Sequence, residues 1–386
     1  MAALVLAALA AGLYGGPPAQ PLPDPVADQV AAAFLTEITR AHLPKPRRDG
    51  RLDAFARALA ASGAATHLPG RMLVEHELRS QGLIEATPHL AMAAAVPGSV
   101  DLLARDLGRG GPHTVAELHG DRVPLRFGVG TALIGGVHHA VIATTEHGLV
   151  LRPIPRRLPA SGSVWLAVVL EAHLAHPMLI VQRPDGTTSR TRMHPADAGY
   201  TARLRCARDG TYRVEIAAEG PFGPEVAANF PMYCAIPPPS APSAEITGEG
   251  ALPANEAEAE AALFRAIDAD RRRAGVPALR RDPRLDALAR AHSADMRARG
   301  YVGHRSPSGD TAVERARRAG LHASLIAENV GRARSVADAE AGFLESPGHR
   351  ENLLVEDATH VGVGVAFVPS PDGAREILVT QLFARF

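Results

Sequence analysis

The sequence predicts an α+β protein of three domains, with helices around short sheets at both ends and a small β-sandwich between them. Short β-branched or alternating runs, bounded by Pro, Asp and Gly, fill residues 156–236 and predict the β-sandwich. Residues 237–254 are rich in Pro, Ser and Gly, as is typical of a linker. Helical periodicity dominates residues 26–155 and 255–386, and each of these segments ends in apolar strand patterns.

Length and charge limit the classes of function. The 386 residues are enough for two or three domains with proper cores. The 41 basic and 41 acidic side chains give a formal net charge of zero. The overall charge therefore offers no electrostatic case for binding nucleic acid or an anionic membrane.

Residues 1–25 comprise a signal-like segment and a Pro-rich spacer. The apolar run 1–16 is too short for a membrane span, and it suits the apolar part of a secretory signal, although a basic start is missing. A buried helix is the alternative. Because the run is short, no transmembrane anchor is predicted, and because no Cys follows it, no lipoprotein anchor is predicted either. We expect a secreted or periplasmic protein.

An internal repeat links the two ends of the chain. Residues 47–59 and 280–292 are identical at ten of thirteen positions, and weaker matches follow in the same order. Such self-similarity predicts a duplicated unit, with residues 26–155 as the diverged copy. Leu59 stands where the C-terminal copy has His292, and no Glu-Asn pair occurs near residues 85–92. The alternative is an unrelated helical domain with chance similarity. His67 and His113 are candidate remnants of a lost site.

The β-sandwich contains the only Trp and both cysteines. Trp165 is expected in its core. Cys206 and Cys234 lie in segments that read as strands, and they could pair in an exported protein. Two separate buried thiols are the alternative.

The C-terminal domain begins with an acidic, alanine-rich helix start at Asn255, and Gly275 ends that helix. Pro283 starts the next helix, where His292 lies at helical spacing among apolar residues. The pattern then predicts two further helices and two strands, at 311–318, 335–344, 361–368 and 376–383.

Three motifs in this domain place a titratable side chain in a short polar or Gly-rich segment. They are His304 in Gly-His-Arg-Ser-Pro, Glu328 in Glu-Asn, and His349 in Gly-His-Arg. Two neutral imidazoles and a carboxylate can form an open divalent-metal site or an acid–base site. Spacing alone does not choose between the two.

These motifs, in this order, resemble the CAP superfamily, the SCP-like secreted domain, in its bacterial form. The resemblance covers about residues 255–386 and implies an α-β-α sandwich. It implies an extracellular cleft that contains His304, Glu328 with Asn329, and His349. The family's second Glu follows an aromatic residue; Phe343 occupies the aromatic position, and Ser346 stands where the carboxylate would fall. The metal ligands would be His304 and His349, with zinc or another divalent cation as the cofactor.

Each of these residues also has a plain structural interpretation. His304 and His349 could be surface histidines, and Glu328 could be part of an ordinary helix end. His292 suits a buried core histidine as well as a cleft-lining residue. Glu328 and His292 are the catalytic candidates if the cleft is an active site. Arg350 is expected to fix the loop around His349.

Two functions follow as expectations. The first is a non-catalytic extracellular protein that binds a lipid, a glycan or another protein. The alternative is a metal-assisted hydrolase acting on peptide or cell-envelope substrates. No His-Glu-x-x-His segment is present, so the common metalloprotease helix is not predicted.

Overall fold

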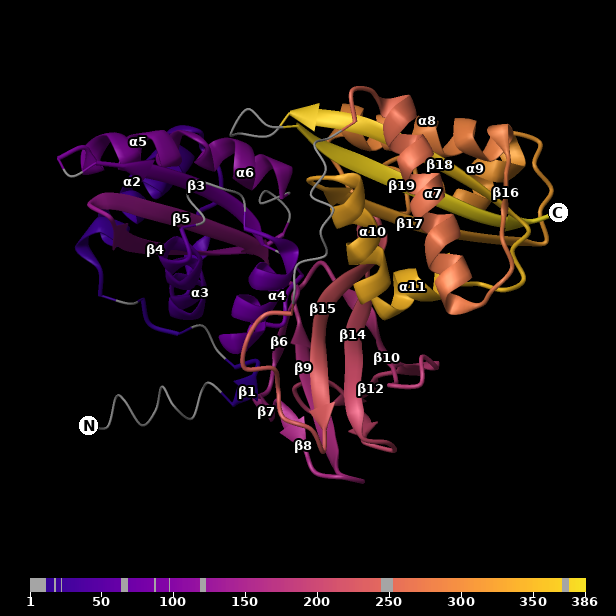
Figure 1. Cartoon of the computed structure of the whole chain (residues 1–386), viewed down its shortest axis with the longest axis horizontal. Helices are drawn as coiled ribbons and strands as arrows, with labels where there is room; N and C mark the ends of the chain where they lie inside the picture. Colours follow the sequence, from indigo (N-terminus) through magenta and orange to yellow (C-terminus); the bar gives the residue numbers. More distant parts are fainter. Residues whose placement is uncertain are drawn as a thin grey trace. The chain divides into compact units, whose positions relative to one another are not determined.

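A computed structural model describes residues 12–16, 19–21, 23–63, 69–86, 88–96, 98–118, 123–243, 253–369 and 375–386 (Figure 1). The chain divides into two compact units. One holds the N-terminal domain and most of the β-sandwich, and the other holds residues 180–182, 217–225 and 247–386. Every helix in the described ranges is too short or too polar to cross a membrane.

The N-terminal domain is built on a four-stranded sheet of order β2-β4-β5-β3. Helix α3 packs against β4 and β5, while α2 packs against α5 and β4. Asp24 and Asp49 cap α2 and α3 by accepting backbone N–H groups, which satisfies donors that a helix start leaves free. The element bounds are α2 (Pro25–Arg40), β2 (Arg47–Arg48), α3 (Gly50–Ala61), α4 (Arg71–Ser80), β3 (His89–Ala95), α5 (Val100–Arg109), α6 (Gly111–Glu117), β4 (Leu125–Ile134) and β5 (Val137–Glu146).

The C-terminal domain is built on a sheet of order β16-β18-β19-β17, with β17 at one edge. Apolar side chains of α7 and α10 pack on one face with alternate residues of β18 and β19. Helix α8 packs on the other face. The bounds are α7 (Glu256–Ala274), β16 (Arg280–Arg281), α8 (Pro283–Arg299), α9 (Ala312–Arg318), β17 (Leu325–Ala333), α10 (Val336–Glu345), α11 (Pro347–Leu353), β18 (His360–Pro369) and β19 (Arg375–Arg385).

In the N-terminal and C-terminal domains the central helix is attached to the sheet by an equivalent buried hydrogen bond. In the N-terminal domain the Asp53 carboxylate accepts the N–H of Val129 at 2.8 Å, which ties α3 to β4. In the C-terminal domain the Asp286 carboxylate accepts the N–H of Val363 at 2.9 Å, which ties α8 to β18. Strand order, helix placement and this buried bond agree, so the fold class predicted for both ends of the chain is confirmed.

The residues between these domains form two sheets, of order β11-β10-β14-β15-β8 and β12-β13-β9-β6. Cys206, directly after β13, forms a disulfide with Cys234, the last residue of β15, and their Cα atoms lie 5.6 Å apart. The cysteines therefore pair and join the two sheets. The bounds are β6 (Leu149–Leu151), β8 (Arg157–Leu158), β9 (Ser163–Leu170), β10 (Ala175–Gln182), β11 (Thr188–Arg192), β12 (His194–Ala196), β13 (Gly199–Arg205), β14 (Gly210–Gly220) and β15 (Gly223–Cys234).

Trp165 is not a core residue, and the prediction for it is wrong. Its side chain is 59% exposed on β9, whereas Leu166 and Val168 are buried. Successive side chains of a strand point to opposite faces. The strand β9 has apolar side chains at both odd and even positions, and therefore on both faces. The sequence pattern could not show which of the two faces is buried.

The signal-like run also ends inside the fold. Strand β1 (Leu13–Tyr14) pairs antiparallel with β7 (Ile154–Pro155), and the Tyr14 ring is fully buried against Phe230 at 4.9 Å. Residues 1–11 lie outside the described ranges, as does His67. Leu13 and Tyr14, near the end of the run, thus form a paired strand of the first unit.

Candidate functional site

Glu328 and Asn329 lie on the edge strand β17, not in a loop or at a helix end as the sequence suggested. Because they are neighbours on a strand, their side chains point to opposite faces of the sheet. Glu328 reaches the side of α8 and α9, and Asn329 reaches the side of α10 and α11. The Glu-Asn pair therefore contacts both helical layers at one point of the sheet edge.

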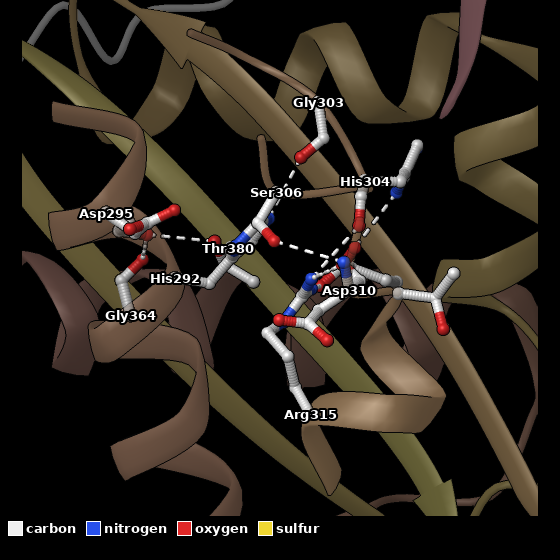
Figure 2. Close-up of polar contacts among 12 residues, drawn as sticks. His292, Asp295, Gly303, His304, Ser306, Asp310, Arg315, Gly364 and Thr380 are labelled. Atoms are coloured by element: carbon white, nitrogen blue, oxygen red, sulfur yellow. Dashed lines mark hydrogen bonds and ion pairs between the residues drawn. The ribbon is translucent and has the colours of Figure 1, made fainter. Parts of the chain in front are cut away.

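Glu328 binds the loop that carries His304. One carboxylate oxygen accepts the His304 Nδ1–H at 3.0 Å, and the other pairs with Arg315 of α9. Arg315 also donates to the carbonyl oxygens of His304 at 3.0 Å and Asp310 at 2.9 Å, as Figure 2 shows. Each oxygen of this buried carboxylate thus accepts a bond.

The Glu328 carboxylate stays charged at pH 7 although it is buried. Burial acts to raise the pKa of Glu328, but the hydrogen bond from His304 and the charge of Arg315 outweigh it and lower the pKa. The same bond holds the His304 proton on Nδ1, so Nε2 is free to accept a bond from a ligand.

His349 lies in the first turn of α11 rather than in a loop. Its ring centroid is 6.4 Å from that of His304, and the ring packs edge-on against Phe343 at 5.2 Å. Asn329 donates its side-chain amide to the His349 carbonyl at 3.1 Å. Burial, and then the neighbouring His304, lower the pKa of His349 to about 3. The imidazole is therefore neutral at pH 7, the form that binds metal ions.

The start of α11 is held by two further side chains. Ser346 caps the helix by accepting the His349 N–H at 3.4 Å, so the serine at this position has a structural role. Asn352 donates to the carbonyl of Glu328 at 3.0 Å and to the side chain of Asn329 at 3.1 Å. Arg350 lies in the same helix, and its contribution to the cleft stays a prediction.

His292 is placed in the core behind the cleft. The side chain is 1% exposed, and its Nε2–H donates to the Gly303 carbonyl at 2.9 Å (Figure 2). Burial lowers its pKa, so the ring is neutral at pH 7. His292 therefore supports the backbone next to His304.

Residues 217–225 belong to the same compact unit and meet the His304 loop. The Arg305 N–H donates to the Phe222 carbonyl at 2.8 Å, and the Phe222 and Tyr301 ring centroids lie 5.0 Å apart. This support could not be predicted from the sequence, because the two segments lie about eighty positions apart.

Two polar side chains behind Asn329 were also missed. Gln381 of β19 accepts from the Asn329 amide at 3.0 Å and donates to Glu340 of α10 at 2.8 Å. The second Glu340 oxygen, Oε1, has no hydrogen-bond partner within the described part of the chain. Burial raises the pKa of Glu340 to about 7. The sequence does contain a sign of this buried carboxyl group, because Glu340 lies beside Ala339 and Phe343 on the apolar face of α10.

Glu340→Gln should remove a pH-dependent loss of stability. Between pH 4.5 and 7 the folded protein holds a proton on Glu340 that the unfolded chain has released, so stability falls as pH rises through this window. We expect wild type and variant to be similar at pH 5. At pH 8 the variant should be more stable by about 2 kcal/mol.

Urea unfolding at both pH values measures this difference. Glu351→Gln, an exposed position on α11, is the matched control and should follow wild type. A Glu340→Gln variant that follows wild type at both pH values would contradict the assignment.

The residues present fit a weak rather than a closed metal site. Both Glu328 oxygens are engaged, which leaves His304 Nε2 and a ring nitrogen of His349 as donors. Glu328 then orients a metal-binding histidine from behind, a common arrangement. Among the described residues, no group of three or more His, Cys, Asp or Glu side chains is arranged to hold a metal ion. Water would complete the coordination.

The N-terminal copy lacks this chemistry. Leu90 pairs with Ala143 in the register at which Glu328 pairs with Leu382, so Leu90 replaces the carboxylate. Ala91 likewise replaces Asn329. His113 is exposed on α6. The N-terminal domain has the same sheet arrangement, with apolar side chains at these two edge-strand positions.

The C-terminal domain is thus a sheet between two helical layers, with Glu328 on its edge strand bonded to His304 and the His349 ring 6.4 Å from that of His304. Residues 264–383 match the model of the Cysteine-rich secretory protein family, known as CAP, and this part of the chain is a bacterial CAP, or SCP, domain. The chain is 28% identical over 113 residues to the uncharacterised protein YkwD of Bacillus subtilis. The match spans 29% of this chain and 44% of that relative.

Two solved structures are similar. An extracellular SCP-domain protein from Bacillus anthracis is 22% identical with a TM-score of 0.30, over 58% of this chain and 78% of that one. A cysteine-rich secretory protein from Staphylococcus aureus is 12% identical with a TM-score of 0.29, over 62% and 82%. The domain assignment rests on the family model.

Proposed function

We propose that the chain is a secreted, non-catalytic CAP-domain protein that binds an extracellular lipid, glycan or protein through the cleft between His304 and His349. The bonding of the Glu328 carboxylate is the main support. A general base must reach the proton that it removes, and each oxygen of this buried carboxylate already accepts a bond, one from His304 and one from Arg315.

Ser306 supports the same proposal. Its hydroxyl bonds to Ser308 at 2.9 Å and accepts the Asp310 N–H at 3.1 Å. An activated serine needs an adjacent base that takes its proton, and the bonds of Ser306 stay within its own turn. The Ser306 turn shapes the His304 loop and provides no nucleophile.

The cleft should also take up a divalent cation such as zinc through the two imidazoles. His304→Ala and His349→Ala should each reduce zinc affinity at least tenfold in calorimetry, because each removes one of two nitrogen donors. His322→Ala removes an exposed histidine outside the cleft and should leave the titration unchanged. Equal zinc uptake by all four proteins would contradict a shared site.

Catalysis is tested separately with Glu328→Gln. A screen of peptide and ester substrates should give the same background rate for wild type and variant. Turnover in wild type that the variant loses would overturn the non-catalytic assignment in favour of a hydrolase.

A further inference from the structure

The open face of the sheet β12-β13-β9-β6 carries an exposed aromatic and cationic platform. Trp165 is 59% exposed and Val169 is 50% exposed, and both lie on this face of β9. The register places Arg203 of β13 opposite Trp165, and Arg205 opposite Ser163. Both arginines are exposed, so the chain's only Trp is flanked by positive charge.

The platform is ordered before any ligand binds. The guanidinium carbon of Arg203 lies 6.0 Å from the Trp165 ring centroid, within the range of a cation–π contact. Arg203 also donates to the Ser163 hydroxyl at 3.1 Å and 2.8 Å. A guanidinium has five N–H donors, so others remain available for a ligand. Fixing the group in advance lowers the entropy cost of binding.

The face holds no compensating acid. Val150, Ala167, Thr201 and His194 share the face by register, and the residues paired across it on these four strands include no Asp or Glu. A planar ring beside two exposed guanidinium groups complements a ligand with both an apolar surface and negative charge. Arg binds carboxylate and phosphate groups with two parallel hydrogen bonds.

We propose that this face binds an acidic polysaccharide, with a sugar ring stacked on Trp165 and its carboxylate or phosphate bound by Arg203 and Arg205. A single ring on a flat sheet suits one sugar residue of an extended chain. A single-stranded nucleic acid would use successive aromatic platforms along a basic groove. A membrane would favour an amphipathic helix with a large apolar face. The site is separate from the His304 cleft.

The experiment is affinity electrophoresis of the full chain in gels containing polygalacturonate, a phosphate-bearing teichoic acid or neutral pullulan. Wild type should be retarded by at least one anionic polymer and not by pullulan. Trp165→Ala and Arg203→Gln should each weaken the binding about tenfold. Arg192→Gln, an exposed arginine on the other sheet, should behave as wild type.

Each outcome decides the proposal. The carboxylate and phosphate gels distinguish the two sources of negative charge. Thermal unfolding of the variants should match wild type because both side chains are exposed. Absence of retardation in both anionic gels, or retardation that Trp165→Ala leaves unchanged, would overturn the site. Trp165-dependent binding of single-stranded DNA or of anionic vesicles, but of neither polymer, would assign the face to another ligand.

Discussion

Gly364→Ala should destabilise the C-terminal domain by about 3 kcal/mol or more, the largest effect we expect of a single methyl group. Gly364 lies on β18, where an added Cβ would overlap backbone atoms of Ala289 and Arg290 in α8. Backbone cannot rotate away as a side chain can. The helix would have to lift from the sheet, which breaks the Ser293 hydroxyl bond to the Gly364 carbonyl at 3.0 Å.

The N-terminal copy provides the paired experiment. Gly130 occupies the equivalent place on β4, and its added Cβ would overlap the backbone of Ala56 and Arg57 in α3. Calorimetric unfolding should show a loss in each single variant. Gly12→Ala, with open space around the added Cβ, should change little. Unaltered melting of Gly364→Ala would contradict the close packing of α8 on β18.

Arg315→Met should cost about 3–5 kcal/mol at pH 7, because it leaves Glu328 charged and buried without its partner. The Glu328 side chain is 4% exposed and the Arg315 side chain 12%. The pH dependence should also reverse. In wild type the lowered pKa of Glu328 adds stability above the ordinary pKa, and this is lost as pH falls. The variant should instead gain stability as acid neutralises the carboxylate.

A second substitution separates charge from packing. Arg315→Met with Glu328→Gln removes both charges and should recover most of the lost stability. Arg318→Met, on the same helix, breaks a surface pair with Asp310 and should cost less than about 1 kcal/mol. Urea unfolding of the four proteins tests the pair. If Arg315→Met alone loses no more stability than Arg318→Met, a buried charge at Glu328 would be contradicted.

Helices could be predicted from the sequence where capping residues and the apolar pattern indicated the same start. Asp282 caps α8 and Pro283 begins it, so its start was readable from the chain. The repeat around Asp53 and Asp286 was readable because it preserves one buried bond to the sheet. Strand β17 was not predicted, since its run Leu325–Ala333 lacks alternation and contains Gly331.

The residues of the proposed site could be named from the sequence, but the hydrogen bonds among them could not. His304, Glu328 and His349 could be named from their motifs. Which oxygen of Glu328 binds which partner depends on α9 packing beside an edge strand. The roles of Arg315 and Gln381 arise only when separate elements of the domain are folded together: α9 against β17 for Arg315, and β19 against α10 and β17 for Gln381.

We propose that folding brings His304 and His349 together, so that both imidazoles bind the same ligand. A crystal grown at neutral pH with zinc, recorded at the zinc absorption edge, tests it most directly. We expect one anomalous peak between the two imidazoles, with Glu328 bonded to His304 behind it. Zinc bound elsewhere, or to only one of the two rings, would contradict the account.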